Sequence, residues 1–180
     1  AIAADGEITL LGTARVKKHL TLPAIGIDIG GTAPTITRLG TTFGYAFTIG
    51  DDGYFHFELP DNWDSTTALA VALHVYTNAV AGNIRFQGVW AAVPEGGAEA
   101  VDAPTHTATM TGADLAVSAT AKGQQEYVVG SIPAASLAVD DTVFILVSRI
   151  ARSGGADPAN EPVVLSLEVE YYANKLGAAT

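Results

Sequence analysis

Two stretches near the end of the chain, TVFILVSR at residues 142–149 and VVLSLEVEYY at residues 163–172, decide the fold class. In the first stretch, Val143, Ile145 and Val147 place apolar side chains at every second position. Successive side chains of a β-strand point to opposite faces of a sheet, so a period of two puts one apolar row on a buried face. We therefore predict that both stretches are central, well-buried β-strands.

The same alternation extends back to residue 41. Residues 41–49 and 53–59 alternate on either side of a Gly-Asp-Asp-Gly turn, and we expect them to pair as a hairpin. About eight strands, with no helical pattern long enough to cross over a parallel sheet, predict an all-β fold, an antiparallel jelly-roll-like β-sandwich. The other predicted strands lie at residues 69–75, 84–90, 105–110, 114–121 and 126–132.

The first 40 residues differ from the rest, because Ala, Gly, Thr and Pro dominate them and the alternation is broken. A chain of 180 residues is long enough to bury one hydrophobic core and too short for two. We therefore expect an extended N-terminal arm or peripheral strands at residues 1–40, a β-sandwich domain at residues 41–174 and a flexible tail at residues 175–180.

The composition restricts what the chain binds. It is 48% hydrophobic and only 16% charged, and its longest apolar run is far shorter than the roughly 20 residues of a membrane-spanning helix. Protein partners are therefore the expected cover for the apolar excess, and no membrane contact is expected. The net charge of −10 opposes binding to nucleic acid. The absence of Cys excludes disulfides, thiolate metal sites and Cys nucleophiles.

One glycine-rich motif, GIDIGGT at residues 26–32, resembles the first phosphate-binding loop of sugar kinases and acetate kinases of the actin-like fold. That fold needs two α/β lobes, a second phosphate loop and a catalytic Asp on a helix. An all-β chain of this length does not accommodate these parts. We interpret the motif as a glycine-rich turn in the N-terminal segment.

The sequence gives little support for a histidine metal site or for a serine hydrolase. His19, His56, His74 and His106 lack the paired spacing of metal ligands, so no metal site is predicted. His56 and His74 are expected on the solvent face of their strands. No Gly-x-Ser-x-Gly elbow occurs, so a serine hydrolase has no anchor in the sequence.

Asp-rich turns occur at residues 51–52, 61–64 and 140–141. Ca²⁺ takes six to eight oxygen ligands, but none of these turns matches an EF-hand loop. Asp side chains cap their own backbone in turns, so we interpret all three as turn formers. A calcium-dependent lectin is the alternative.

Two tryptophans are candidates for an aromatic platform on which sugars stack. Trp90 shares an alternating face with Ile84 and Phe86, so we expect it in the core. Trp63 follows Pro60 in a turn, and we expect it to be exposed, either to a sugar or to a neighbouring subunit.

Four segments carry a resemblance to a known family: FELPDNWD at residues 57–64, GVWA at 88–91, DTVFILVSR at 141–149 and the last strand at 165–172. Together they resemble the recurrent jelly-roll unit of tailed-bacteriophage virion proteins, which occurs in head decoration proteins, head fibres and tail fibres. The resemblance spans residues 53–172. It implies a homotrimer on the virion surface, with an N-terminal segment that reaches the capsid or a neighbouring subunit.

We therefore expect a non-enzymatic capsid decoration (cement) protein that stabilises the shell as an oligomer and binds itself and capsid or other virion proteins. The alternatives are a fibre or a carbohydrate-binding β-sandwich module that recognises a host surface glycan, and a hydrolase on a sandwich scaffold. No catalytic residue, cofactor or metal ion is expected. Arg149 lies between apolar residues and should pair with a carboxylate. The predicted docking residues are Arg15, Lys17, Lys18 and Trp63.

Overall fold

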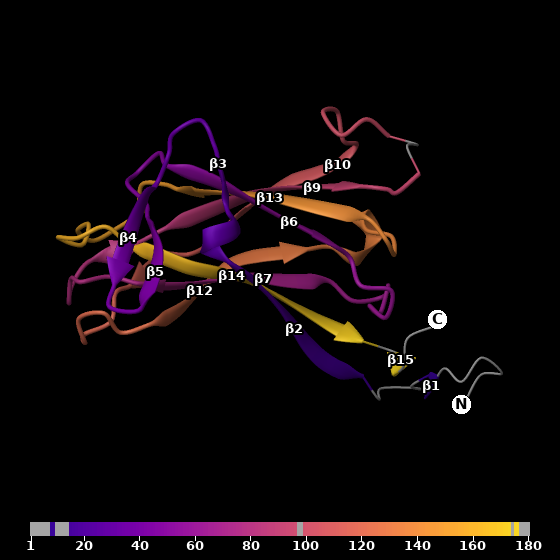
Figure 1. The fold of residues 1–180 in the computed structure, drawn as a ribbon, viewed down its shortest axis with the longest axis horizontal. Helices are drawn as coiled ribbons and strands as arrows, with labels where there is room; N and C mark the ends of the chain where they lie inside the picture. The colour runs from indigo at the N-terminus through magenta and orange to yellow at the C-terminus, as the bar shows by residue number, and fades with distance from the viewer. Residues whose placement is uncertain (1–7, 10–14, 97–98, 174, 177–180) are drawn as a thin grey trace.

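The structure is a computed structural model that describes residues 8–9, 15–96, 99–173 and 175–176. Two antiparallel sheets face each other, and connecting loops lie at both ends (Figure 1). Every pairing between the described strands is antiparallel, which confirms the predicted all-β, jelly-roll-like sandwich. The described residues contain no helix that is long and apolar enough to span a membrane.

The first sheet has five strands in the order β10-β9-β13-β6-β3. β13 lies between β9 and β6, as predicted for a central strand. Its residues Val143, Ile145 and Val147 are fully buried and face the second sheet. The strands are β3 (Asp28–Ile29), β6 (Asp52–Glu58), β9 (Phe86–Val93), β10 (His106–Thr111) and β13 (Thr142–Arg149).

The second sheet has six strands, with β12-β7-β14-β5-β4 in order and β2 also paired to β14. β14 is 11 residues long, so one of its edges pairs with β5 near the start of the strand and with β2 along the rest. The strands are β2 (Val16–Pro23), β4 (Thr35–Leu39), β5 (Thr42–Ala46), β7 (Leu69–Tyr76), β12 (Gln125–Ile132) and β14 (Val163–Ala173).

Four short strands and two single turns of 3₁₀ helix complete the described structure. β1 (Ile8–Thr9) pairs with β15 (Lys175–Leu176), and β8 (Asn83–Ile84) pairs with β11 (Leu115–Ala116). The 3₁₀ turns are η1 (Ala24–Gly26) and η2 (Ala134–Ser136).

The core lies between the two sheets and is built from their alternating apolar rows. Val71 and Leu73 of β7 are fully buried. Phe86 meets Phe47 and Tyr127 edge to face, at ring-centroid distances of 5.8 and 5.3 Å. Each fully buried side chain of this size contributes about 1.5–3 kcal/mol relative to exposure, so the two apolar rows are what hold the sheets together.

The predicted hairpin between residues 41–49 and 53–59 is wrong. β5 pairs with β4 and β14 in the six-stranded sheet, whereas β6 pairs with β3 and β13 in the five-stranded sheet. Between β5 and β6, a turn carries the chain across the sandwich: Thr48 N–H donates to Asp51 Oδ2 at 2.7 Å, and Asp51 N–H donates to Thr48 O at 3.1 Å. Alternation identifies a strand but does not choose its partner, and jelly-roll connections cross between sheets.

The Asp-rich turns do act as turn formers, as predicted. Asp51, Asp64 and Asp141 are each 4% exposed. Asp141 accepts a hydrogen bond from Ala138 N–H at 2.7 Å, and Asp64 accepts from Thr66 N–H and Oγ1 at 3.0 and 2.7 Å. These carboxylates satisfy backbone donors that the turns leave without a strand partner.

The predicted strand at residues 114–121 is wrong over most of its length, since only the two residues of β11 form a strand. The small side chains of this segment give little to pack. Asp114 instead accepts hydrogen bonds from the backbone N–H groups of Ser153 and Gly154 at 3.0 and 2.8 Å, which ties this segment to the loop before β14.

The N-terminal segment contributes β2, β3 and β4 to both sheets. β2 pairs with β14 from Pro23 opposite Ser166 to Val16 opposite Ala173, and its partly buried Leu20 and Leu22 pack against the core. A truncation at residue 22 would therefore remove most of an edge strand. The domain boundary at residue 40 stays a prediction. The rest of the proposed arm and tail, residues 1–7, 10–14, 174 and 177–180, lies outside the described residues.

Candidate functional site

The predicted docking cations lie on or beside β2. Arg15 Nε lies 2.6 Å from Asp64 Oδ2, and Lys17 Nζ lies 2.5 Å from Glu170 Oε2. The hydrogen bond to Glu170 raises the pKa of Lys17 above its ordinary value. Strand alternation turns Lys18 to the opposite side of β2. The structure therefore pairs two of the cations with carboxylates of the same chain and does not gather all three on one face, and their docking role stays a prediction.

The expected exposure of Trp63 is wrong, because its side chain is only 2% exposed. The turn folds back on itself, with Trp63 N–H donating to Pro60 O at 2.8 Å. The indole Nε1–H donates to Thr67 O at 3.1 Å, so its one polar group is satisfied and the ring can be buried. Trp63 has no surface to offer a sugar or a neighbouring subunit. Trp90 is 3% exposed and lies in the core, as predicted.

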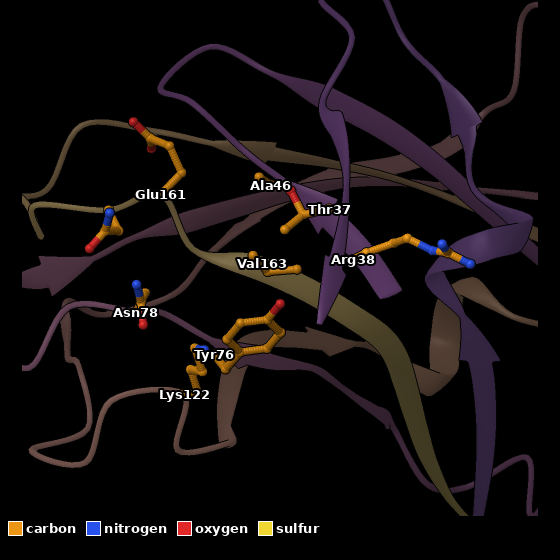
Figure 2. A pocket seen from close by; sticks show the side chains of 9 residues that line it. Thr37, Arg38, Ala46, Tyr76, Asn78, Lys122, Glu161 and Val163 are labelled. Carbon is orange, nitrogen blue, oxygen red and sulfur yellow. The ribbon is translucent and has the colours of Figure 1, made fainter. Parts of the chain in front are cut away.

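A pocket of about 340 Å³ lies where the β4–β5 hairpin meets the end of β7 and the loops that carry Lys122 and Asn160 (Figure 2). Its apolar part comes from Ala46 of β5 and Val163 of β14. The rest of the lining is polar: Thr37, Arg38, Tyr76, Asn78, Lys122, Asn160 and Glu161. A pocket of this size falls within the range that small organic ligands occupy.

Tyr76 is the most informative residue of this pocket. It is the last residue of β7, and because Leu73 and Val75 point into the core, alternation directs Tyr76 to the outer side of the sheet. The side chain is nevertheless 5% exposed, and its hydroxyl has no hydrogen-bond partner among the described residues. Burial raises the pKa of this hydroxyl. Leaving a buried hydroxyl unpaired costs about 1–3 kcal/mol, so Tyr76 is the strongest candidate for a ligand contact.

A buried arginine fixes the carboxylate at the pocket rim. Arg149 is 3% exposed, and its guanidinium donates to Phe47 O at 2.7 Å, to Asp157 Oδ1 at 3.3 Å and to Glu161 Oε2. The predicted pairing of Arg149 with a carboxylate is therefore confirmed. Desolvation lowers the pKa of Arg149, and the charge of Asp157 acts in the opposite direction. Glu161 thus enters the pocket lining as one half of an ion pair.

The outer surface of the six-stranded sheet carries a connected set of ionisable side chains. Glu168 of β14 accepts from His19 Nδ1 at 2.6 Å and from His74 Nε2 at 2.9 Å, and these hydrogen bonds, the one from His74 first, lower its pKa. Gln124 Nε2 lies 2.9 Å from His74 Nδ1 and completes the row. Within the described part of the chain, no group of three or more His, Asp or Glu is arranged to hold a metal ion. We call Lys17, His19, His74, Glu126, Glu168 and Glu170 the charged face.

The outer surface of the five-stranded sheet is different in character. Asp52 and Glu58 occupy the two ends of β6, and Asp28 of the edge strand β3 lies opposite Tyr54. Between Asp52 and Glu58, the outward rows of β6, β13, β9 and β10 contain no Asp, Glu, Lys or Arg. Tyr54 is 41% exposed there, and the ring of His56 lies 6.0 Å from that of Phe144. We call Tyr54, His56, Val89, Ala91, Thr107, Thr109, Phe144 and Leu146 the neutral face.

The glycine-rich motif at residues 26–32 lies against the end of β6. A Cβ on Gly30 would lie 1.7 Å from Asp52 Oδ1, so any larger residue here would force the Asp52 carboxylate to move. Thr32 N–H donates to the same oxygen at 3.3 Å. The motif therefore packs against β6, and the prediction of a turn holds only in part, because β3 occupies its middle and the chain bends at residues 31–32.

Sequence reasoning missed the pocket, because no local pattern connects the residues that line it, which are 37, 38, 46, 76, 78, 122, 160, 161 and 163. One signal was present. The outward row of β7 otherwise consists of Ala70, Ala72 and His74, and Tyr76 ends it with a large amphipathic side chain followed closely by Asn78.

No family model matches the chain, and no curated protein matches it. Its fold is similar to the CBM36-1 domain of a multidomain xylanase from the hindgut metagenome of Trinervitermes trinervoides, with a TM-score of 0.45, 10% identity, and coverage of 89% of this chain and 98% of that one. It is also similar to a family 35 carbohydrate binding module from Clostridium thermocellum, at TM-score 0.47 and 14% identity over 84% and 97% of the two chains. A third likeness, to a chain of infectious bursal disease virus Gx strain, has TM-score 0.42 and 15% identity over 88% and 33%.

These solved structures are β-sandwich domains of the jelly-roll type, and at such identities they bear on the fold alone. The resemblance of the sequence to phage virion proteins has no family match behind it.

Proposed function

We propose that this chain is a non-enzymatic structural protein of a particle surface, a capsid decoration protein that assembles as an oligomer through its neutral face. The observation that carries the proposal is the contrast in charge. The chain has a net charge of −10, yet the outward rows of β6, β13, β9 and β10 between Asp52 and Glu58 carry no formally charged residue, and Asp28 lies beside them on the edge strand β3.

Charge favours the neutral face as the contact between copies. Two acidic chains repel each other, and the repulsion acts over about 8 Å at physiological ionic strength. The cost is highest where carboxylates such as Glu168 and Glu170 would be brought together and desolvated. Tyr54, Phe144 and Leu146 can instead be covered without burying an unpaired charge, and aromatic residues are enriched in such contacts.

The size of the neutral face favours a closed ring over an isolated pair. Four strands about 4.8 Å apart and about 24 Å long cover on the order of 500 Å². A stable interface buries about 800 Å² on each partner, so one such face alone supports only weak pairing. In a cyclic trimer every subunit makes two contacts through two different patches, so the neutral face would supply one patch, another surface of the chain would supply the second, and the buried area per subunit is the sum of both. This supports the homotrimer that the family resemblance implies.

A decoration protein acts by mass action. It binds the assembled shell and not the dissociated shell proteins, so it stabilises the shell by RT ln(1 + [L]/Kd) for each site without any chemical step. The partners under this proposal are other copies of the chain and capsid or other virion proteins, and its place is the virion surface.

The test is the molar mass of the purified full chain by light scattering, measured together with co-sedimentation with purified capsids. We expect a trimer that sediments with the capsids. A monomer at all accessible concentrations that stays in the supernatant would contradict the proposal.

A second candidate is a fibre or a carbohydrate-binding module that recognises a host surface glycan. One observation favours it: the pocket at the end of β7, whose lining contains the side-chain amides of Asn78 and Asn160 and the hydroxyl of Tyr76, which no described residue pairs. A monomer that binds a glycan array but no capsid would favour this candidate over the first.

A further inference from the structure

We infer that the pocket at the end of β7 binds one neutral, hydroxyl-rich ring, a single pyranose unit of a saccharide, with Tyr76 as a specificity-determining contact. This inference deepens the second candidate function and does not depend on assembly through the neutral face.

The hydroxyl of Tyr76 is the feature of the pocket that most favours a sugar ligand. Figure 2 shows it directed toward the β4–β5 hairpin, beside Val163 and Thr37. The phenolic group both donates and accepts hydrogen bonds, as a sugar hydroxyl does. Because the residue is 5% exposed and the hydroxyl has no partner among the described residues, a ligand hydroxyl here would satisfy a group that the fold leaves unpaired.

The rest of the lining also suits a sugar ring. The amides of Asn78 and Asn160 each offer donors and an acceptor, and these suit adjacent hydroxyls on one ring. Ala46 and Val163 supply an apolar patch of the kind that covers the C–H face of a pyranose. A volume of about 340 Å³ accommodates one ring and not an extended chain, so a longer glycan would enter by its end.

The charges of the lining residues favour a neutral ligand over an anionic one. Lys122 and Glu161 line the pocket with opposite charges, and Glu161 is already paired with Arg149. The guanidinium of Arg38 extends away from the pocket in Figure 2. Arginine binds carboxylates and phosphates through a bidentate fork, and the one arginine among the lining residues does not point into the pocket, while Lys122 would have to bind an anion beside the carboxylate of Glu161. The lining therefore fits a neutral sugar.

The test is saturation-transfer NMR of the full chain with methyl glycosides of glucose, galactose and mannose, and with glucuronic acid for comparison. A single ring has few atoms, so we expect a dissociation constant that is roughly millimolar. Tyr76→Phe should weaken binding about three- to tenfold, the loss of one neutral hydrogen bond. A glycoside that lacks the ring hydroxyl in contact with Tyr76 should bind the wild-type chain more weakly than the parent glycoside does. Tyr76→Phe should bind both glycosides with the same affinity.

Tyr172→Phe is the matched control, because it removes an exposed tyrosine hydroxyl near the end of β14 that lies away from Val163 and the pocket, and binding should not change. Thermal unfolding separates a ligand role from a structural one. Removing an unpaired buried hydroxyl should leave the melting temperature of Tyr76→Phe equal to or above that of the wild type. Asn78→Ala, at an exposed position, should weaken binding independently.

No binding by any neutral glycoside, binding of glucuronic acid alone, or equal affinity in wild type and Tyr76→Phe would each overturn the inference. None of these results would alter the trimer or its capsid binding, so failure of this inference and failure of the decoration proposal remain distinguishable.

Discussion

The two outer surfaces of the sandwich differ in how their side chains are paired. The charged face places Lys17 beside Glu170 and both His19 and His74 on Glu168, so its ionisable groups satisfy one another across neighbouring strands. The neutral face has no such pairs and exposes Tyr54, Leu146 and their neighbours instead. A surface whose polar groups are already satisfied has little to gain from a partner. A neutral apolar surface gains by being covered, which is why we assign contact between copies to the five-stranded sheet.

The largest effect is expected from placing a charge on the neutral face. Leu146→Glu should weaken assembly roughly a hundredfold or more, because an unpaired carboxylate would be buried between subunits. Folding should change little, since the side chain points outward from β13. Light scattering across a concentration series measures the effect. The control is Val128→Glu, at a 60% exposed position on the outer side of β12, which should assemble like the wild type. If Leu146→Glu remains a trimer, the neutral face is not the interface.

A smaller effect, on folding alone, is expected on the charged face. Glu168→Gln removes the carboxylate that binds His19 and His74, and it should lower the free energy of unfolding by about 1–2 kcal/mol at neutral pH. Urea unfolding measures the loss. Glu126→Gln, at an exposed position on the same face, is the control and should have little effect. Assembly of Glu168→Gln should match that of the wild type, and a loss of trimer would place the interface on this face instead.

The same carboxylate should make stability depend on pH. The pKa of Glu168 lies below its ordinary value of 4.5 in the folded chain. Its contribution is therefore fully present above pH 4.5 and is lost as the pH falls through the folded-state pKa. The difference in unfolding free energy between wild type and Glu168→Gln should shrink between about pH 4.5 and pH 3. A difference that stays constant over this range would mean that the hydrogen bonds do not depend on ionisation of Glu168.

The smallest effect on stability is expected at the exposed ion pair of the charged face. Lys17→Gln should leave the melting temperature almost unchanged, because exposed pairs are screened by solvent. This variant tests the docking prediction cleanly. If Lys17 binds the capsid, co-sedimentation should fall while folding and trimer formation persist, and unchanged co-sedimentation would remove Lys17 from the docking set.

The strands of the sandwich could be predicted from alternation because burial leaves a period of two in the sequence. Val143, Ile145 and Val147, and the apolar row of β7, all lie where that period placed them. The partner of each strand could not be predicted, because the turn at Asp51 looks alike whether it closes a hairpin or crosses between sheets. Burial of Trp63 was missed for a similar reason, since its turn pairs with the distant end of β14, where Trp63 forms a β-bridge with Ala173.

The surfaces were harder to predict than the core. His56 and His74 lie on the outward rows of their strands, as expected, but the link from His74 to Glu168 requires the register between β7 and β14, which are about 90 residues apart in the sequence. The pocket around Tyr76 depends on three separate loops and hairpins meeting at one end. Alternation along a strand does not indicate which distant loops lie next to it in the fold.

The pairing of β2 with β14 has a mechanical consequence. Val16 and Ala173, where β2 begins and β14 ends, lie opposite each other in one antiparallel ladder, and β1 and β15 pair just beyond them. Tension applied through these two ends would pull the strands apart sideways, so the ladder would open one pair at a time from Val16 toward Pro23. Such unzipping needs less force than shearing all eight pairs together. The fold would therefore resist force better if a partner were attached to only one of these two ends, because the tension would then not act across this ladder.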